Sequence, residues 1–244
     1  MRKLVNSESS DVLRPVGFRA HIEPELASPV SPVIKSKRGG ARNFANRTSD
    51  LISVTQARTF LSGIEDAIDC GRPPNVHKTL NLAAMGIEDE DAVQAIGQFM
   101  KSYRDWLARK GERLVWNWVR ENPAGGGTHV HILMHVPPEF APLLRRRQYH
   151  WLNQIARKYQ TYKPRKTKGR IHTSRIGGTL KTFQRNPSKH RTNLNIVVGY
   201  VLKGASNDKL RLLGITRRHV DCGTVIGKRV GRWQRRRSKA AQSS

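Results

Sequence analysis

Acidic residues are scarce in this 244-residue sequence, with 18 Asp and Glu against 45 Lys and Arg. The resulting formal net charge of +27 opposes compaction by self-repulsion unless a polyanionic partner takes it up. The imbalance is concentrated in residues 140–207, which contain no Asp or Glu. A basic stretch of this length is typical of a surface that follows a phosphate backbone, so nucleic acid is the expected partner. A ribosomal or purely structural nucleic-acid binder would have the same composition.

Cysteines and long apolar runs are also scarce. The two cysteines, Cys70 and Cys222, form no Cys-x-x-Cys pair, so neither a zinc cluster nor a disulfide framework is expected. No apolar run approaches the ~18–20 residues that span a bilayer. No apolar segment follows Arg2 and Lys3, so a signal peptide is not expected either. These absences predict a cytoplasmic protein that has no membrane partner.

Apolar residues make up 37% of the chain, which is below the usual share and indicates that part of it lies outside a core. Residues 1–50 are rich in Pro, Ser, Gly and Arg and show no period, which predicts a disordered basic tail. Residues 51–215 are expected to form one folded domain that carries a basic insert at about 140–190. Residues 216–244 are expected to form a second basic tail.

Hydrophobic spacing within the domain predicts both helices and strands. Apolar residues three and four apart predict helices over 54–70, 91–110, 138–159 and 192–204. Strands are expected over 77–84, 113–121 and 129–137, with a shorter one near 170–176. The short Gly-rich connection between 121 and 129 predicts an antiparallel hairpin. The expected fold class is therefore α+β, with a central antiparallel β-sheet flanked by helices.

The strand "HVHILMHVP" places His129, His131 and His135 on one face, while its other face is wholly apolar. Glu121 ends the preceding strand, across the Gly-rich turn from His129. Two imidazoles and one carboxylate leave open positions for a phosphate oxygen and water. This donor set suits Mn²⁺, or Mg²⁺ when substrate oxygens complete the shell, and Zn²⁺ is chemically possible. The alternative is that these histidines are merely polar residues on the solvated face of a sheet.

His135 is expected to lie at the surface or to face the substrate rather than to bind the metal. Farther along the chain, Tyr200 and Lys203 are three residues apart and would share one face of a helix. A tyrosine becomes a useful nucleophile when its electrophile is a phosphodiester polarised by a metal and a nearby cation. Lys203 could supply that cation. A lone tyrosine among apolar residues more often packs in a core.

Taken together, "HVH" at 129–131, Glu121 eight residues upstream and "YVLK" at 200–203 resemble the HUH endonucleases. They are most similar to the single-tyrosine Rep proteins that initiate rolling-circle replication of plasmids and small circular DNAs. "TLNLA" at 79–83 resembles the first motif of that family, a strand that supports the site and contacts DNA. The resemblance spans about residues 50–205. It implies a ferredoxin/RRM-like core with the metal on central strands and the tyrosine helix beside them.

The resemblance further implies a metal-dependent nickase and ligase of single-stranded origin DNA. Glu121, His129 and His131 would hold the ion, Tyr200 would form a 5′-phosphotyrosine link, and Lys203 would assist it. No Walker motif is present, so a host helicase and a host polymerase are expected partners. Residues expected to contact the nucleic acid are Thr79, Asn81, Arg145, Arg146, Arg147, Lys163, Arg165, Lys166, Lys168 and Arg170.

Two other functions fit parts of this pattern. A single-tyrosine transposase of a small insertion sequence shares the HUH chemistry, although the basic tails are unusual for it. A non-catalytic DNA- or RNA-binding protein, such as a repressor, would explain the charge. A pure binder has no need of the complete set of Glu121, His129, His131, Tyr200 and Lys203. That set therefore favours an enzyme.

Overall fold

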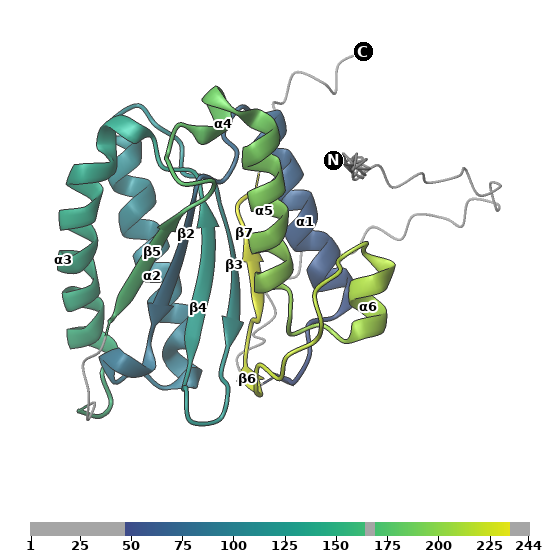
Figure 1. Cartoon of the computed structure of the whole chain (residues 1–244). Coiled ribbons are helices and arrows are strands. Elements are labelled where there is room, and N and C mark those ends of the chain that lie inside the picture. The colour runs from purple at the N-terminus through teal and green to yellow at the C-terminus, as the bar shows by residue number, and fades with distance from the viewer. Residues whose placement is uncertain (1–46, 164–168, 235–244) are drawn as a thin grey trace, which may run out of the picture. The chain divides into compact units, whose positions relative to one another are not determined.

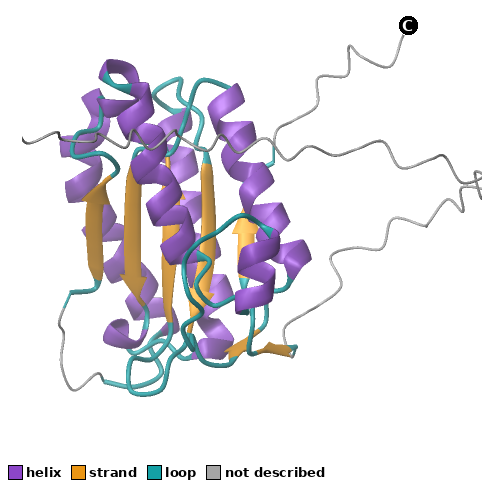
Figure 2. Cartoon of the chain, turned by 45° about the vertical axis from the view of Figure 1, so that its right-hand side comes forward, coloured by secondary structure: helices purple, strands orange, loops and turns teal. Residues whose placement is uncertain are grey.

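The computed structural model describes residues 47–163 and 169–234. Five antiparallel strands form one sheet in the order β5-β2-β4-β3-β7, and helices cover both of its faces (Figure 1) (Figure 2). This arrangement confirms the predicted α+β class with an antiparallel sheet flanked by helices. The helices are α1 (Val54–Asp69), α2 (Asp89–Ala108), α3 (Ala141–Tyr159), α4 (Thr182–Arg185), α5 (Pro187–Val201) and α6 (Asn207–Leu212), with 3-10 turns at Ala83–Met85 and Pro138–Phe140.

The strands of the main sheet are β2 (Val76–Asn81), β3 (Trp116–Glu121), β4 (His129–Met134), β5 (Ile171–Arg175) and β7 (Val230–Arg232). Two short strands, β1 (Thr48–Ser49) and β6 (Val225–Ile226), pair with each other. The histidine strand β4 is the central strand, with β2 and β3 on either side.

Each face of the sheet has its own hydrophobic core, and the alternation of side chains along β4 divides them. Val130, Ile132 and Met134 pack with the buried stripes of α2 and α3. Leu133, on the other face, packs with α1 and α5. The histidines share this second face, so they lie beneath helices rather than on a solvated sheet surface. The alternative of a solvated histidine face is therefore wrong.

The β3–β4 hairpin forms as the sequence predicts. Its register pairs Glu121 with His129, and Val119 with His131. The connecting turn contains Gly125 and Gly127 at φ 71° and φ 68°, a backbone region that L side chains rarely adopt. A Cβ atom on Gly127 would also lie 2.5 Å from the Ala83 Cβ. The glycines thus let the chain reverse tightly enough to bring the carboxylate opposite the first histidine.

The predicted basic insert at 140–190 is, over its described residues 140–163 and 169–190, an integral part of the fold. Helix α3 buries Leu144, Trp151 and Leu152 in the core that it shares with α2. Strand β5 pairs with β2 and forms one edge of the sheet. The basic residues occupy the solvent side of these elements, while their buried side is apolar. The prediction of an insert was based on charge and is therefore wrong.

The predicted C-terminal tail is also wrong for residues 216–234. This segment supplies β6 and β7, and β7 forms the second edge of the sheet beside β3. Arg229 is fully buried and donates to the carbonyl oxygens of Ser49 at 2.8 Å and Gly223 at 2.6 Å. Buried backbone acceptors thus compensate for removing this guanidinium from water. Residues 235–244 of the predicted C-terminal tail and residues 1–46 of the predicted N-terminal tail lie outside the described residues. The end of the predicted N-terminal tail, at 48–49, is described and forms strand β1.

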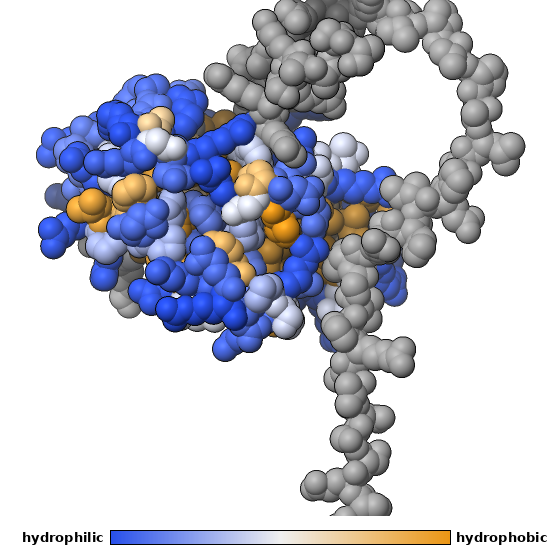
Figure 3. Space-filling view, turned by 90° about the horizontal axis from the view of Figure 1, so that it is seen from above, coloured by the Kyte–Doolittle hydropathy of each residue, from blue (hydrophilic) through white to orange (hydrophobic). Residues whose placement is uncertain are grey.

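Seen from above, the described surface is largely hydrophilic, and hydrophobic residues show there in small patches (Figure 3). Within the described ranges, no helix combines the length and apolar character that crossing a bilayer requires.

Candidate functional site

The hairpin and the neighbouring strands assemble a compact group of metal-ligand side chains. The Oε2 atom of Glu121 lies 3.3 Å from Nε2 of His129 and 3.5 Å from Nε2 of His131. One potential ligand atom from each residue lies within 4.8 Å of the other two. Glu121 and His131 are buried, while the His129 side chain is 18% exposed. These three residues, the ones that the sequence predicts, could hold a metal ion open to a ligand on one side.

The two imidazoles are held so that Nε2 faces the carboxylate. Nδ1 of His129 lies 3.0 Å from the Gly127 carbonyl, which can only accept, so Nδ1 is the donor, and in the neutral ring the lone pair is then at Nε2. Nε2 of His131 is buried and has no hydrogen-bond partner. A buried nitrogen without a partner is costly, and a metal ion would satisfy it. Burial also lowers the pKa of His131, which favours the neutral imidazole that a metal requires.

Strand β2 supplies the groups that orient His131. Nδ1 of His131 lies 3.1 Å from Thr79 Oγ1 and 3.1 Å from His77 Nε2. Register explains this contact, because Thr79 is the direct cross-strand partner of His131 and shares its face. A hydrogen bond at Nδ1 fixes the ring orientation and the tautomer of a metal-binding histidine. Thr79 is therefore part of the site through His131.

Glu121 also receives a cation from the tyrosine segment. Lys203 Nζ donates to Glu121 Oε1 at 2.5 Å, which leaves Oε2 for the two imidazoles. Burial alone would raise the pKa of this carboxyl. The close imidazoles of His129 and His131 and the Lys203 ammonium outweigh burial and hold the pKa of Glu121 well below its usual value. The carboxylate is therefore ionised throughout the physiological range.

Tyr200 lies beside this cluster on the last turn of α5. Its ring centroid is 5.2 Å from that of His131 and 4.2 Å from Lys203 Nζ. Helix α5 crosses the histidine face because Leu194, Val198 and Val201 pack into the core on that side. The helix ends at Val201, earlier than predicted, so Lys203 sits in the following turn yet still meets the tyrosine.

No family model, curated protein or solved structure matches this chain.

Two residues that the sequence analysis missed complete the surroundings of Tyr200. The His77 ring centroid lies 6.0 Å from the tyrosine ring, and Cζ of Arg217 lies 5.7 Å from its centroid. His77 was accessible to sequence reasoning, since it lies two residues before Thr79 and alternation places both on one face. Arg217 left no such signal, because its position depends on how the chain after α6 returns past α5.

His135 does not face a substrate. The strand ends at Met134, so the alternation that would align His135 with the other two histidines stops there. Its side chain is buried, Nδ1 lies 2.9 Å from the Pro73 carbonyl oxygen, and its ring meets Phe183 edge-on. Burial lowers the pKa of His135. The residue is a packed structural histidine, and the prediction of an exposed one is wrong.

The residues predicted to contact nucleic acid are dispersed. Among those described, Thr79 is brought to the metal-ligand group. Asn81 instead accepts a hydrogen bond from the Ala84 backbone at 3.0 Å, and Arg170 donates to Asn153 at 2.6 Å. Lys163 is exposed. Residues Arg165, Lys166 and Lys168 lie outside the described residues.

The arginine triplet of α3 lies on the other side of the sheet from the cluster. Arg145, Arg146 and Arg147 are exposed on α3, and α3 packs on the face opposite the histidines. The triplet and the metal-ligand group therefore cannot form one continuous site through the sheet.

Proposed function

We propose that this protein is a metal-dependent nickase and joining enzyme for single-stranded DNA, with Tyr200 as the nucleophile. The observation that carries the proposal is the position of Tyr200, whose ring lies beside both the His131 ring and the Lys203 ammonium. A tyrosine, a lysine and a metal-ligand triad drawn from three separate segments, β3, β4 and residues 200–203, converge at one place. Such convergence has a chemical use in phosphodiester transfer, whereas a pure nucleic-acid binder does not need it.

The donor set fits a divalent ion. Two neutral imidazoles and one carboxylate suit Mn²⁺, or Mg²⁺ with substrate oxygens completing the shell. Bound there, the ion would supply Lewis-acid polarisation of the scissile phosphate. Glu121, His129 and His131 would hold it through Oε2 and the two Nε2 atoms, and Thr79 would keep the His131 ring aligned.

The residues of this chain would then carry out a reversible transesterification. The Tyr200 phenol oxygen attacks phosphorus and loses its proton to solvent. The bond from phosphorus to the 3′-oxygen breaks, and that oxygen takes up a proton. Lys203, whose ammonium lies against the tyrosine ring, stabilises negative charge developing on the phenol oxygen.

The products are a 5′-phosphotyrosine link and a free 3′-hydroxyl. In the reverse direction a 3′-hydroxyl attacks the phosphotyrosine, restores the phosphodiester and releases Tyr200. The covalent link conserves the energy of the broken bond, so joining needs no nucleotide cofactor.

The biological role that fits best is initiation of rolling-circle replication of a plasmid or phage-like element in the cytoplasm. The free 3′-hydroxyl would prime a host polymerase, and a host helicase would unwind the duplex. The resemblance of "HVH" and "YVLK" to the single-tyrosine Rep proteins supports this role.

A covalent-adduct assay tests the proposal. The full chain is incubated with circular single-stranded DNA and Mn²⁺, and adducts are resolved on a denaturing gel after nuclease trimming. We expect an adduct with the wild type and with Tyr149→Phe, an exposed tyrosine on α3, but none with Tyr200→Phe. DNA binding should be retained in both variants. Binding without any adduct in Mn²⁺ or Mg²⁺ would instead assign the protein to non-catalytic binders.

A further inference from the structure

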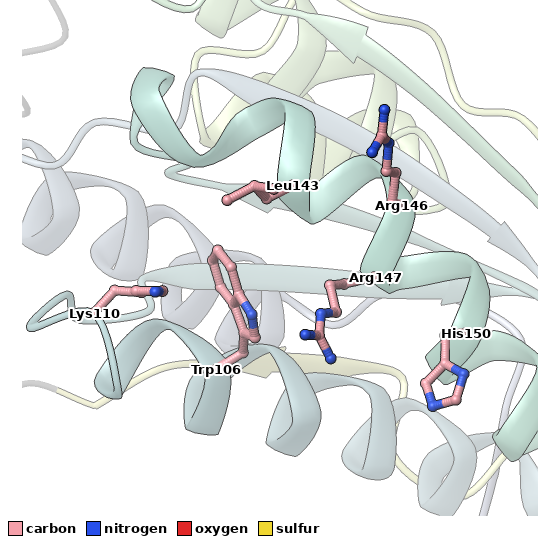
Figure 4. Close-up of a pocket in the computed structure, with 6 residues that line it drawn as sticks. All are labelled: Trp106, Lys110, Leu143, Arg146, Arg147 and His150. Carbon is pink, nitrogen blue, oxygen red and sulfur yellow. The ribbon is translucent and has the colours of Figure 1, made fainter.

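Helices α2 and α3 border an open cleft that the proposed chemistry does not use. It has a volume of about 400 Å³, within the range of ligand pockets. Its lining residues come from α2, the turn that follows α2, and α3: Trp106, Lys110, Leu143, Arg146, Arg147 and His150. Figure 4 shows the Trp106 indole projecting from α2 toward Leu143 of α3, with Lys110 on one side of it and Arg147 on the other.

The cleft follows directly from helical periodicity. Three lining residues of α3 follow Leu143 at spacings of three, four and seven: Arg146, Arg147 and His150. Residues at these spacings form one stripe of a helix. A neighbouring stripe carries Leu144, Gln148, Trp151 and Leu152 into the core. The polar stripe is therefore fixed against α2 by a rigid, buried neighbour rather than by a loop.

The charge of the cleft is of one sign. Two guanidinium groups and one ammonium line it, and its described lining includes no carboxylate. Asp105 of α2 is engaged by Lys101 at 2.6 Å and by Arg104 at 3.2 Å. The cleft lining therefore offers its cations no carboxylate with which to pair. Paired guanidinium groups match phosphate geometry especially well.

We propose that this cleft binds the phosphate backbone of a nucleic-acid strand, as a second contact surface on the sheet face opposite the metal-ligand group. Trp106 is 6% exposed, so it offers a floor for sugars but no open face for stacking a base. Recognition is accordingly of phosphates and independent of sequence. The surface functions whether or not Tyr200 nicks DNA.

A polymeric ligand fits better than a small anion. Further exposed basic side chains lie outside the cleft lining, at Arg109 just after α2 and at Arg157 and Lys158 on α3. Helix α3 has no acidic residue anywhere along its length. Several exposed cations beyond the cleft can neutralise further phosphates of one strand, whereas an isolated phosphate site would not require them.

The test compares the double variant Arg146→Gln/Arg147→Gln with a control of equal charge, Arg58→Gln/Arg104→Gln. Both control residues are exposed and lie outside the cleft, and Arg104 is already paired with Asp105. Binding of the full chain to labelled oligonucleotides is measured by fluorescence anisotropy in EDTA, from 50 to 200 mM salt. Single-stranded and duplex oligonucleotides of scrambled sequence form separate arms. Circular dichroism verifies that each variant is folded.

Losing two phosphate contacts should lower the salt slope of binding by about 1.4 for a single strand and about 1.8 for a duplex. Over this fourfold range of salt, the wild type should therefore lose about 7- to 12-fold more affinity than the cleft variant. The control should keep the wild-type slope. If only one arm shows its expected change of slope, that arm identifies the strand form that the cleft takes.

Equal slopes for the cleft variant and the wild type in both arms would overturn the proposal. The proposal would also be overturned if the cleft variant lost binding of poly-glutamate but kept its binding of oligonucleotides. The ligand of the cleft would then be an acidic peptide. Because EDTA prevents metal-dependent cleavage, these results are separate from the adduct assay, and either proposal can fail alone.

Discussion

Replacing Glu121 with glutamine should destabilise the metal-free protein strongly. Glu121 Oε1 accepts from Lys203 at 2.5 Å, and the side chains are only 4% and 9% exposed. Glutamine keeps the shape but removes the charge, so the Lys203 ammonium stays buried without its anion. Breaking a buried ion pair in this way costs about 3–5 kcal/mol of unfolding free energy. For a domain of this size each kcal/mol shifts Tm by roughly 2–4 °C, so Tm should fall by roughly 6–20 °C.

A double-mutant cycle isolates that pair from the other contacts of Glu121. Lys203→Met removes the cation, and the double variant Glu121→Gln/Lys203→Met removes both charges. Urea unfolding in EDTA at pH 7.5 gives the four free energies, and the coupling between the two positions should exceed about 1 kcal/mol. A coupling below about 0.5 kcal/mol, together with an unchanged Tm for Glu121→Gln, would refute the reasoning.

The pH dependence supplies an independent check on the same carboxyl. The folded state holds the pKa of Glu121 below its ordinary value of 4.5, so its stabilisation is present above that value and is lost as pH falls through the folded pKa. The difference between the wild type and Glu121→Gln should therefore be constant from pH 8 to 5 and shrink below about 4.5. Shrinkage near pH 6.5 would attribute the effect to the histidines instead.

Two further substitutions test the site and the fold. Thr79→Val removes the hydroxyl beside His131 Nδ1 and should weaken Mn²⁺ affinity about 10-fold or more, measured by titration, while Thr79→Ser should restore it; equal affinity for the Val variant would remove Thr79 from the site. Truncation after residue 215 removes β7 and Arg229 and should leave the chain unfolded by circular dichroism, whereas truncation after residue 234 should not. A folded 215-residue chain would restore the C-terminal tail of the sequence analysis.

The sequence predicts those parts of the site that depend on local geometry. Glu121 and His129 are joined by a short Gly-rich turn, and the two-residue period of strands then places His131 on the same face. The hairpin, helices α1, α2 and α3, and the proximity of the three metal-ligand residues can all be predicted from residues that lie close together in the sequence. Contacts with distant segments are not needed to place these residues, because the hydrogen bonds between β3 and β4 fix which residues of the two strands face each other.

The parts that could not be predicted depend on contacts between distant segments. The pairing of Lys203 with Glu121 joins residues 82 apart and depends on where α5 crosses the sheet. Strand β7 has three residues, too few to show a period, and its neighbour Arg229 is a charged residue with no exposed surface. The prediction for His135 is wrong for a different reason. It applies the two-residue alternation of a strand to a residue that lies just beyond the end of β4 at Met134.

The arrangement of Glu121 has a consequence for the order of binding at the site. One carboxylate serves Lys203 through Oε1 and faces two imidazoles through Oε2. A divalent cation at Oε2 would lie near the Lys203 ammonium, and like charges in a poorly solvated place repel each other strongly. A phosphate placed against both would offset that repulsion, so Lys203 couples the metal-ligand group to an anionic substrate. Lys203→Met, already part of the cycle above, should therefore bind Mn²⁺ more tightly than the wild type without DNA and lose that advantage when single-stranded DNA is present.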